Sequence, residues 1–241
     1  TGREIYLIPC IQIPLRIKRK PVDIYRRWIT YYEIEKRVTD GELARRYLED
    51  PILGCRSGWR IDFKRALQDP RPYGSDEMEA LQIDMAELDE SLSILSDFNV
   101  LYLELGSETD LLAMSGRVDL LVSMVDHIRE RFGYRVLLGT HHAGSTIPIL
   151  EGSSVKFDGY VTPVNKLGIM MFPTMNMALE AMRGSRRSII AIKPLAGGRI
   201  EPREALEYVY RDRGMGSCMI GVGSESEAVE DLTIASEILR E

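Results

Sequence analysis

The sequence predicts an α/β protein of the (β/α)8 barrel type. In its second half, apolar segments of strand length alternate with amphipathic segments of helix length, an order that requires parallel strands with the helices outside. Near the C-terminus one unit occurs twice: an apolar strand, a turn containing glycine, and an amphipathic helix. The length of 241 residues suits one barrel. We therefore expect residues 1–241 to form a single barrel domain.

Five strands are expected in the second half, each an apolar segment bounded by turn residues. They lie at residues 99–105, 134–139, 157–164, 188–195 and 218–222. Helices are expected between them because apolar side chains recur three and four positions apart. These helices lie at residues 116–131, 145–151 and 174–183, and two more begin at Pro202 and near Glu225.

The first half is less regular. Residues 4–15 have strand-like apolar content that Pro9 and Pro14 interrupt, and residues 21–59 are rich in charged and aromatic residues without a steady period. We expect residues 21–59 to form a helical excursion that caps one end of the barrel. An apolar stripe at helical spacing predicts a continuous helix over residues 75–97. Because two further strands at most remain, we expect the N-terminal half of the barrel to be irregular or incomplete.

Composition excludes several function classes. The net charge of −6 argues against nucleic acid as the main partner, and no apolar run approaches the roughly 18 residues that span a bilayer. Cys10, Cys55 and Cys218 follow no metal-binding or disulfide spacing, so we expect no metal site and a cytoplasmic location. We expect Cys10 and Cys218 to be buried, inert thiols.

The doubled unit predicts a site for an anion. Gly197, Gly198 and Arg199 follow the first strand, and Gly223 and Ser224 follow the second. Backbone amides and the positive end of a helix dipole meet at such places and hold phosphates. Two simpler explanations stay open, namely a tight turn with a solvated arginine, and a capping box between Ser224 and Glu227.

Four further side chains could carry chemistry at the barrel mouth. His141 and His142 follow a strand, and adjacent side chains leave a strand on opposite faces, so only one should face the mouth. Glu104 and Lys193 lie in apolar strands, where an unpaired charge is costly to bury. We expect Lys193 to pair with a carboxylate or a ligand, or to act as a Schiff-base nucleophile, and Glu104 to act as a general base or metal ligand. Asn165 is a candidate polar contact for a ligand.

Taken in order, residues 95–241 resemble the aldo-keto reductase superfamily. Residues 188–199 are similar to its seventh strand and exit loop, and residues 218–235 to its eighth strand, cofactor-phosphate loop and next helix. Residues 138–142 and 157–165 stand where that family has its fifth and sixth strands. The resemblance implies a cofactor, NAD or NADP, held by Asn165, Gly197, Gly198, Arg199, Gly223 and Ser224. Glu225 and Glu227 beside the phosphate loop leave NADP preference open.

The catalytic Asp, Tyr, Lys and His of that family have no identifiable counterparts here. The expected reacting centre is therefore built from Glu104, His141, His142 and Lys193. Our first hypothesis is a divergent NAD(P)-linked oxidoreductase for a small carbonyl substrate. The second is a lyase or isomerase for a phosphorylated metabolite, and the third is a non-catalytic barrel that binds a ligand or partner protein without a cofactor. In the first two the expected partner is a small-molecule or phosphorylated substrate, not nucleic acid or a membrane.

Overall fold

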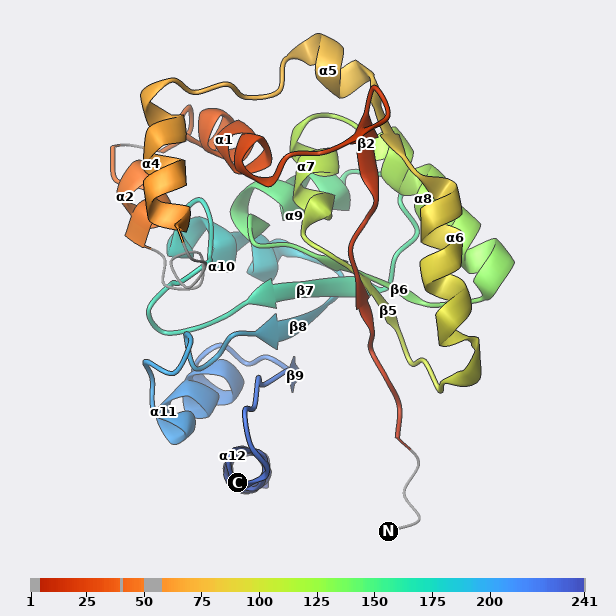
Figure 1. Ribbon diagram of the computed structural model, residues 1–241. Coiled ribbons are helices and arrows are strands. Elements are labelled where there is room, and N and C mark those ends of the chain that lie inside the picture. Colours follow the sequence, from red (N-terminus) through yellow and green to blue (C-terminus); the bar gives the residue numbers. More distant parts are fainter. Residues whose placement is uncertain (1–4, 40, 50–57, 241) are drawn as a thin grey trace.

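The computed structural model describes residues 5–39, 41–49 and 58–240 (Figure 1). Its central feature is a six-stranded sheet in which every pair of neighbouring strands is parallel. The strands run in the order β1 (Cys10–Ile11), β5 (Leu103–Leu105), β6 (Val136–Gly139), β7 (Gly159–Pro163), β8 (Ser188–Ile192) and β9 (Ser217–Cys218).

A helix follows each strand from β5 onward. These helices are α7 (Glu108–Met114) and α8 (Val118–Phe132), α9 (Ala143–Glu151), α10 (Met175–Gly184), α11 (Pro202–Glu207) with the π-helical turn η2 (Tyr208–Asp212), and α12 (Glu225–Ile238). The α/β class and the alternation predicted from the apolar pattern are confirmed. Each predicted strand and helix of the second half is present within a few residues of its expected bounds.

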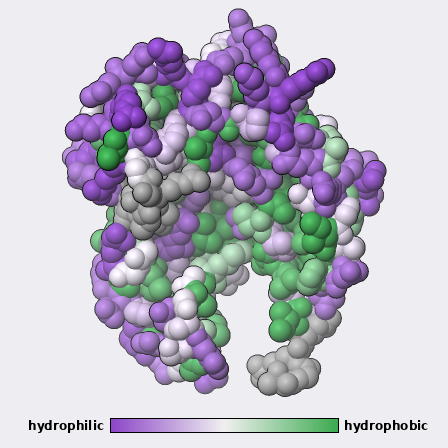
Figure 2. Space-filling model, in the orientation of Figure 1, coloured by the Kyte–Doolittle hydropathy of each residue, from purple (hydrophilic) through white to green (hydrophobic). Residues whose placement is uncertain are grey.

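The sheet does not close into a barrel over the described residues. β1 and β9 form its two edges. Figure 2 shows this face hollowed at its lower edge, between the side of α11 and α12 and the side of the N-terminal segment. β1 pairs directly with β5, so the two strands that a complete barrel needs between them are missing, and the intervening chain forms other elements. This open sheet agrees with the expectation that the N-terminal half of the barrel is irregular or incomplete.

The chain between β1 and β5 forms a small antiparallel sheet and several helices. The sheet has the order β3 (Lys20–Pro21), β2 (Leu15–Ile17), β4 (Leu81–Ile83). The helices include α1 (Ile24–Glu35), α2 (Leu43–Glu49) and α4 (Trp59–Gln68). Residues 40 and 50–57, inside the expected excursion, lie outside the described residues. Asp23 caps α1 by accepting a hydrogen bond from the backbone N–H of Arg26 at 2.8 Å.

The expectation of one helix over residues 75–97 was wrong. This stretch forms α5 (Ser75–Glu79), β4, α6 (Met85–Ser93) and the 3-10 turn η1 (Ile94–Asp97). Leu81 is buried and Gln82 exposed, so the segment also fits strand alternation, and pairing with β2 satisfies its backbone. Asp84 then restarts the helix, because its side chain accepts from the N–H of Glu87.

Gly159 allows β7 and β8 to lie side by side in the buried sheet. A Cβ at this position would lie 2.6 Å from the carbonyl oxygen of Ser188. Gly159→Ala should therefore lower the free energy of unfolding by about 1–3 kcal/mol, measured by urea denaturation. Gly184→Ala is the control, because a Cβ there meets no atom within 4 Å. Equal stability of the two variants would contradict this packing.

Candidate functional site

One groove on the inner side of the sheet brings together three of the four expected catalytic residues. Glu104, His141 and Lys193 line this groove, with Cys10 beside them, and its volume is about 390 Å³. Glu104 comes from β5, whereas His141 follows β6 and Lys193 follows β8. The parallel order of the strands is what places these three distant positions at one end of the sheet.

Gly139, at the end of β6, leaves space for the side chain of Glu104. A Cβ at Gly139 would lie 3.0 Å from Oε1 of Glu104 and 2.8 Å from the carbonyl oxygen of Leu105. Cys10 is the register partner of Glu104 on the neighbouring strand, so the two side chains share the inner face. The negative charge of the Glu104 carboxylate acts on the thiol at this short range.

Lys193 has a backbone conformation that is rare for its residue type. Its φ is +57°, in the left-handed region, immediately after β8 ends. Non-glycine residues in this region store strain of order 1–3 kcal/mol, and such residues cluster at functional sites. The turn puts Lys193 on the wall shared by this groove and a second cleft toward the C-terminus.

The groove changes the proton affinity of the groups that line it. Burial raises the pKa of Glu104, and the nearby positive charge of Lys193 offsets part of that rise. Burial lowers the pKa of His141 well below its ordinary value, and Lys193 lowers it further. His141 is therefore neutral near pH 7, and its buried Nδ1 has no hydrogen-bond partner among the described residues. The groove combines a carboxyl group of raised pKa with a neutral imidazole.

Cys10 does not match its expectation, because it is exposed on the edge strand β1 instead of buried. Loss of hydration in the groove and the neighbouring carboxylate of Glu104 raise the pKa of its thiol to about 12. The reactive thiolate form is therefore disfavoured near neutral pH. Cys218 is half-buried, and burial raises its pKa to about 12. Cys55 lies outside the described residues.

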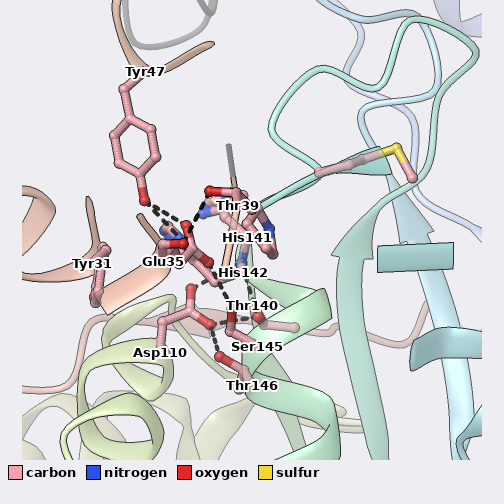
Figure 3. A network of polar contacts seen from close by, with 12 residues as sticks. Tyr31, Glu35, Thr39, Tyr47, Asp110, Thr140, His141, His142, Ser145 and Thr146 are labelled. Carbon is pink, nitrogen blue, oxygen red and sulfur yellow. Dashed lines mark hydrogen bonds and ion pairs between the residues drawn. The ribbon is translucent and has the colours of Figure 1, made fainter. Parts of the chain in front are cut away.

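His142 lies outside the groove, in the protein core. It is fully buried, and its Nδ1 is 2.9 Å from Oε1 of Glu35, the last residue of α1 (Figure 3). The hydroxyl of Tyr47 and the hydroxyl of Ser145 each donate to Glu35 at 2.8 Å. The alternation of side chains along the chain thus puts His141 and His142 in different surroundings, as the sequence predicts, and His142 is not placed to touch a ligand in the groove.

The surroundings of His142 favour its charged form. Burial alone would lower the pKa of His142, but the carboxylates of Glu35 and Asp110 outweigh it and raise the pKa. The rings of Trp28, Tyr31, Tyr47 and Phe172 enclose the imidazole, with centroid distances from 4.4 Å to 6.0 Å. Aromatic faces attract a cation in this way.

Asp110 of α7 fixes the turn that carries both histidines. Its carboxylate accepts hydrogen bonds from the hydroxyls of Thr140 and Thr146 and, at 3.0 Å, from the backbone N–H of His141 (Figure 3). Burial raises the pKa of Asp110, and His142 and these donors offset part of the rise. On the same helix Glu108 forms a buried ion pair with Arg27 of α1. These contacts hold α1, α7 and the β6 exit together.

Some of the groups expected to hold a phosphate are engaged within the chain. Ser224 accepts a hydrogen bond from the N–H of Glu227 at 3.2 Å, and the N–H of Gly223 donates to the Glu227 carboxylate at 2.7 Å, so these amides are engaged within the chain. Arg199 folds back onto its own loop, where Nη1 donates to the carbonyl oxygens of Ala196 and Gly197. Gly197 and Gly198 have φ values of +71° and +78°, as the tight turn requires. That these residues bind NAD or NADP stays a prediction.

Asn165 is also engaged within the chain. Its Nδ2 donates to the carbonyl oxygen of Ile169, and its Oδ1 accepts from the N–H of Ile169, both at 2.9 Å. These bonds close the loop after β7. Among the described residues no group of three or more histidine, cysteine, aspartate or glutamate side chains could hold a metal ion. No helix in the described part of the chain is long and apolar enough to cross a membrane.

Sequence reasoning missed the residues that support the site. Glu35, Asp110 and Glu108 are buried acids on helices, and nothing in the periodicity distinguishes them from solvated acids. Cys10, expected in the core, lies exposed on an edge strand beside Glu104. The pairing of β1 with β5 would have revealed Cys10, but strand order is not written in a single sequence.

Comparison with known proteins gives a distant resemblance. No protein-family model and no curated protein matches the sequence. Two solved structures from Pseudomonas aeruginosa, both provisionally named aldo-keto reductases, match at 15% sequence identity with a TM-score of 0.36. The matches cover 65% of this chain and 82% and 84% of theirs. The resemblance is partial and too weak to carry an argument about activity.

Breaking the buried Glu35–His142 pair should destabilise the protein. His142→Gln leaves a buried carboxylate without its counter-charge, which costs about 3 kcal/mol. The melting temperature should fall by about 6–12 °C for a chain of this size. The Glu35→Gln/His142→Gln double variant should lose less than the sum of the two single losses.

The control and the pH dependence test the same interaction. His127→Gln removes a half-exposed contact to Asp89 and should cost about 1 kcal/mol or less. Because the folded pKa of His142 is raised, its stabilisation is present below the unfolded pKa and is lost as pH rises through the folded value. The stability gap between wild type and His142→Gln should thus narrow as pH rises, and a gap that widens would refute the ion pair.

Cys10 should react slowly with iodoacetamide near pH 8 although it is exposed, because the thiolate is the nucleophile. Glu104→Gln removes a neighbouring negative charge and should speed alkylation by about tenfold for each unit by which the pKa falls. Peptide mass spectrometry measures the rate at Cys10. Exposed Glu90 provides the matched control Glu90→Gln, which should leave the rate unchanged. Fast alkylation of the wild type would overturn the assignment.

Proposed function

We propose that this chain is an enzyme that moves protons at a small carbonyl compound, a lyase or isomerase reaction. The observation that carries the proposal is the meeting of Glu104, His141 and Lys193 in one groove. A carboxyl group, an imidazole and an amine are the groups that enzymes use for general acid–base chemistry. Perturbed proton affinities in a cleft support the same role.

The roles follow from charge and protonation. Lys193 would donate a hydrogen bond to the carbonyl oxygen of the substrate and stabilise the negative charge that develops there. Glu104 would take the proton from the adjacent carbon, and its raised pKa strengthens it as a base. Glu104 would then return this proton to the former carbonyl carbon of a hydroxycarbonyl substrate, while neutral His141 would move a proton from the substrate hydroxyl to the carbonyl oxygen, so that no net proton is gained or lost. Lys193 is the only lysine or arginine of this groove's described lining, alongside Glu104 and Glu108, which favours an uncharged substrate over a phosphorylated one.

Hydride transfer from NADH or NADPH is the second candidate. The groove adjoins a larger cleft through Ile192 and Lys193, so a second molecule could lie beside the substrate. The engaged amides of Gly223 and Glu227 and the inward fold of Arg199 count against a dinucleotide phosphate there. We therefore rank proton transfer first.

Proton transfer can be tested by hydrogen–deuterium exchange at carbon. A panel of small aldehydes, ketones and hydroxyketones in D2O is followed by proton NMR, with and without enzyme. We expect faster exchange than in buffer for at least one compound, and a loss of about 10²-fold or more in Glu104→Gln. The rate should fall as pH drops through a pKa above the ordinary glutamate value, because the base must be ionised. Glu90→Gln is the matched control.

Three results would decide against the proposal. The proposal would be refuted if the protein did not raise the rate of hydrogen–deuterium exchange above that in buffer for any compound. It would also be refuted if Glu104→Gln kept full activity. Oxidation of NADH or NADPH by the same compounds, lost in His141→Gln, would instead support the second candidate.

A further inference from the structure

A cleft of about 700 Å³ lies between the exits of β8 and β9. Its walls are largely apolar, with Leu195 and Ile200 on one side and Met219 and Ile220 on the other. This cleft occupies the place where the doubled strand–turn–helix unit predicts an anion. The negative charges that line the cleft favour a cationic ligand instead.

Four carboxylates line the cleft. Glu201 lies at the start of α11, and Glu227, Glu230 and Asp231 lie on α12. Their spacing of three and four residues puts the latter three on one face of the helix. Within the described lining, Lys193 is the one side chain of opposite charge.

Asp231 sets this cleft apart from a solvated acidic surface. It is 3% exposed and lines the cleft, yet its side chain makes no hydrogen bond or ion pair with any described residue. Its carboxylate oxygens are open to the cleft and are not sealed in the core, so only water or a ligand in the cleft can pair with them. A cationic ligand would supply a partner of opposite charge.

The side chains that line the cleft limit the chemical class of ligand that it can bind. The carboxylates do not form a cluster that could hold a metal ion in the described part of the chain. The apolar walls suit a hydrocarbon stem, and the carboxylates repel phosphate. We propose that this cleft binds an organic cation, with a primary ammonium group on Asp231 and an apolar stem between Leu195 and Ile220. The proposal is independent of the proton-transfer reaction, because its site and its test do not involve Glu104.

Titration of the whole chain with a simple diamine tests the proposal. Isothermal titration calorimetry with 1,5-diaminopentane should show binding, and Asp231→Asn should weaken it by at least tenfold. The neutral analogue 1,5-pentanediol should bind at least tenfold more weakly than the diamine. Asp97→Asn removes one exposed carboxylate outside the cleft and should leave the affinity unchanged.

Thermal unfolding provides a second readout that does not depend on ligand affinity in the variant. Without ligand, Asp231→Asn should melt at a higher temperature than wild type, because it removes the like-charge repulsion between Asp231 and Glu227 on one face of α12. The diamine should raise the melting temperature of wild type and not of the variant. The proposal fails if the diol binds as tightly as the diamine, if Asp231→Asn binds the diamine like wild type, or if inorganic pyrophosphate binds more tightly than the diamine.

Discussion

The ion pair between Glu35 and His142 is the interaction on which the rest of the structure depends. It joins the end of α1 to the exit of β6, two segments that lie 107 positions apart in the chain. Both side chains are fully buried, so each needs the other. With the Arg27–Glu108 pair and the bonds to Asp110, it fixes the irregular N-terminal half against the regular C-terminal half.

The turn after β6 carries two histidines with different roles, one in the core and one in the groove. His142 enters an aromatic and acidic core that favours its charge, whereas His141 enters the groove with its charge suppressed. Gly139, two residues earlier, leaves the space that Glu104 occupies on the inner face. A short stretch of chain thus anchors the N-terminal helix and presents an imidazole beside a carboxylate.

Much of the fold follows from local pattern, and much of the site does not. Apolar periodicity is sufficient for β5 to β9 and their helices, because each signal is contained in its own segment. It fails at residues 75–97, where pairing of Leu81 with Ile17 overrides helical spacing. Glu104, His141 and Lys193 could be selected as polar residues at strand ends, but their supports Glu35 and Asp110 depend on tertiary contacts. The negative charge of the C-terminal cleft comes from four carboxylates, and the sequence does not reveal that one of them, Asp231, is buried.

Imidazole NMR of the protein labelled with nitrogen-15 in histidine measures the central contrast directly. Each of the three histidines can be assigned from its glutamine variant, and each ring is then titrated with pH. The account predicts that His141 stays neutral to a pH well below its ordinary pKa of about 6.5 and that His142 stays protonated above it. Two histidines that titrate together near the ordinary value would contradict the separation of groove and core.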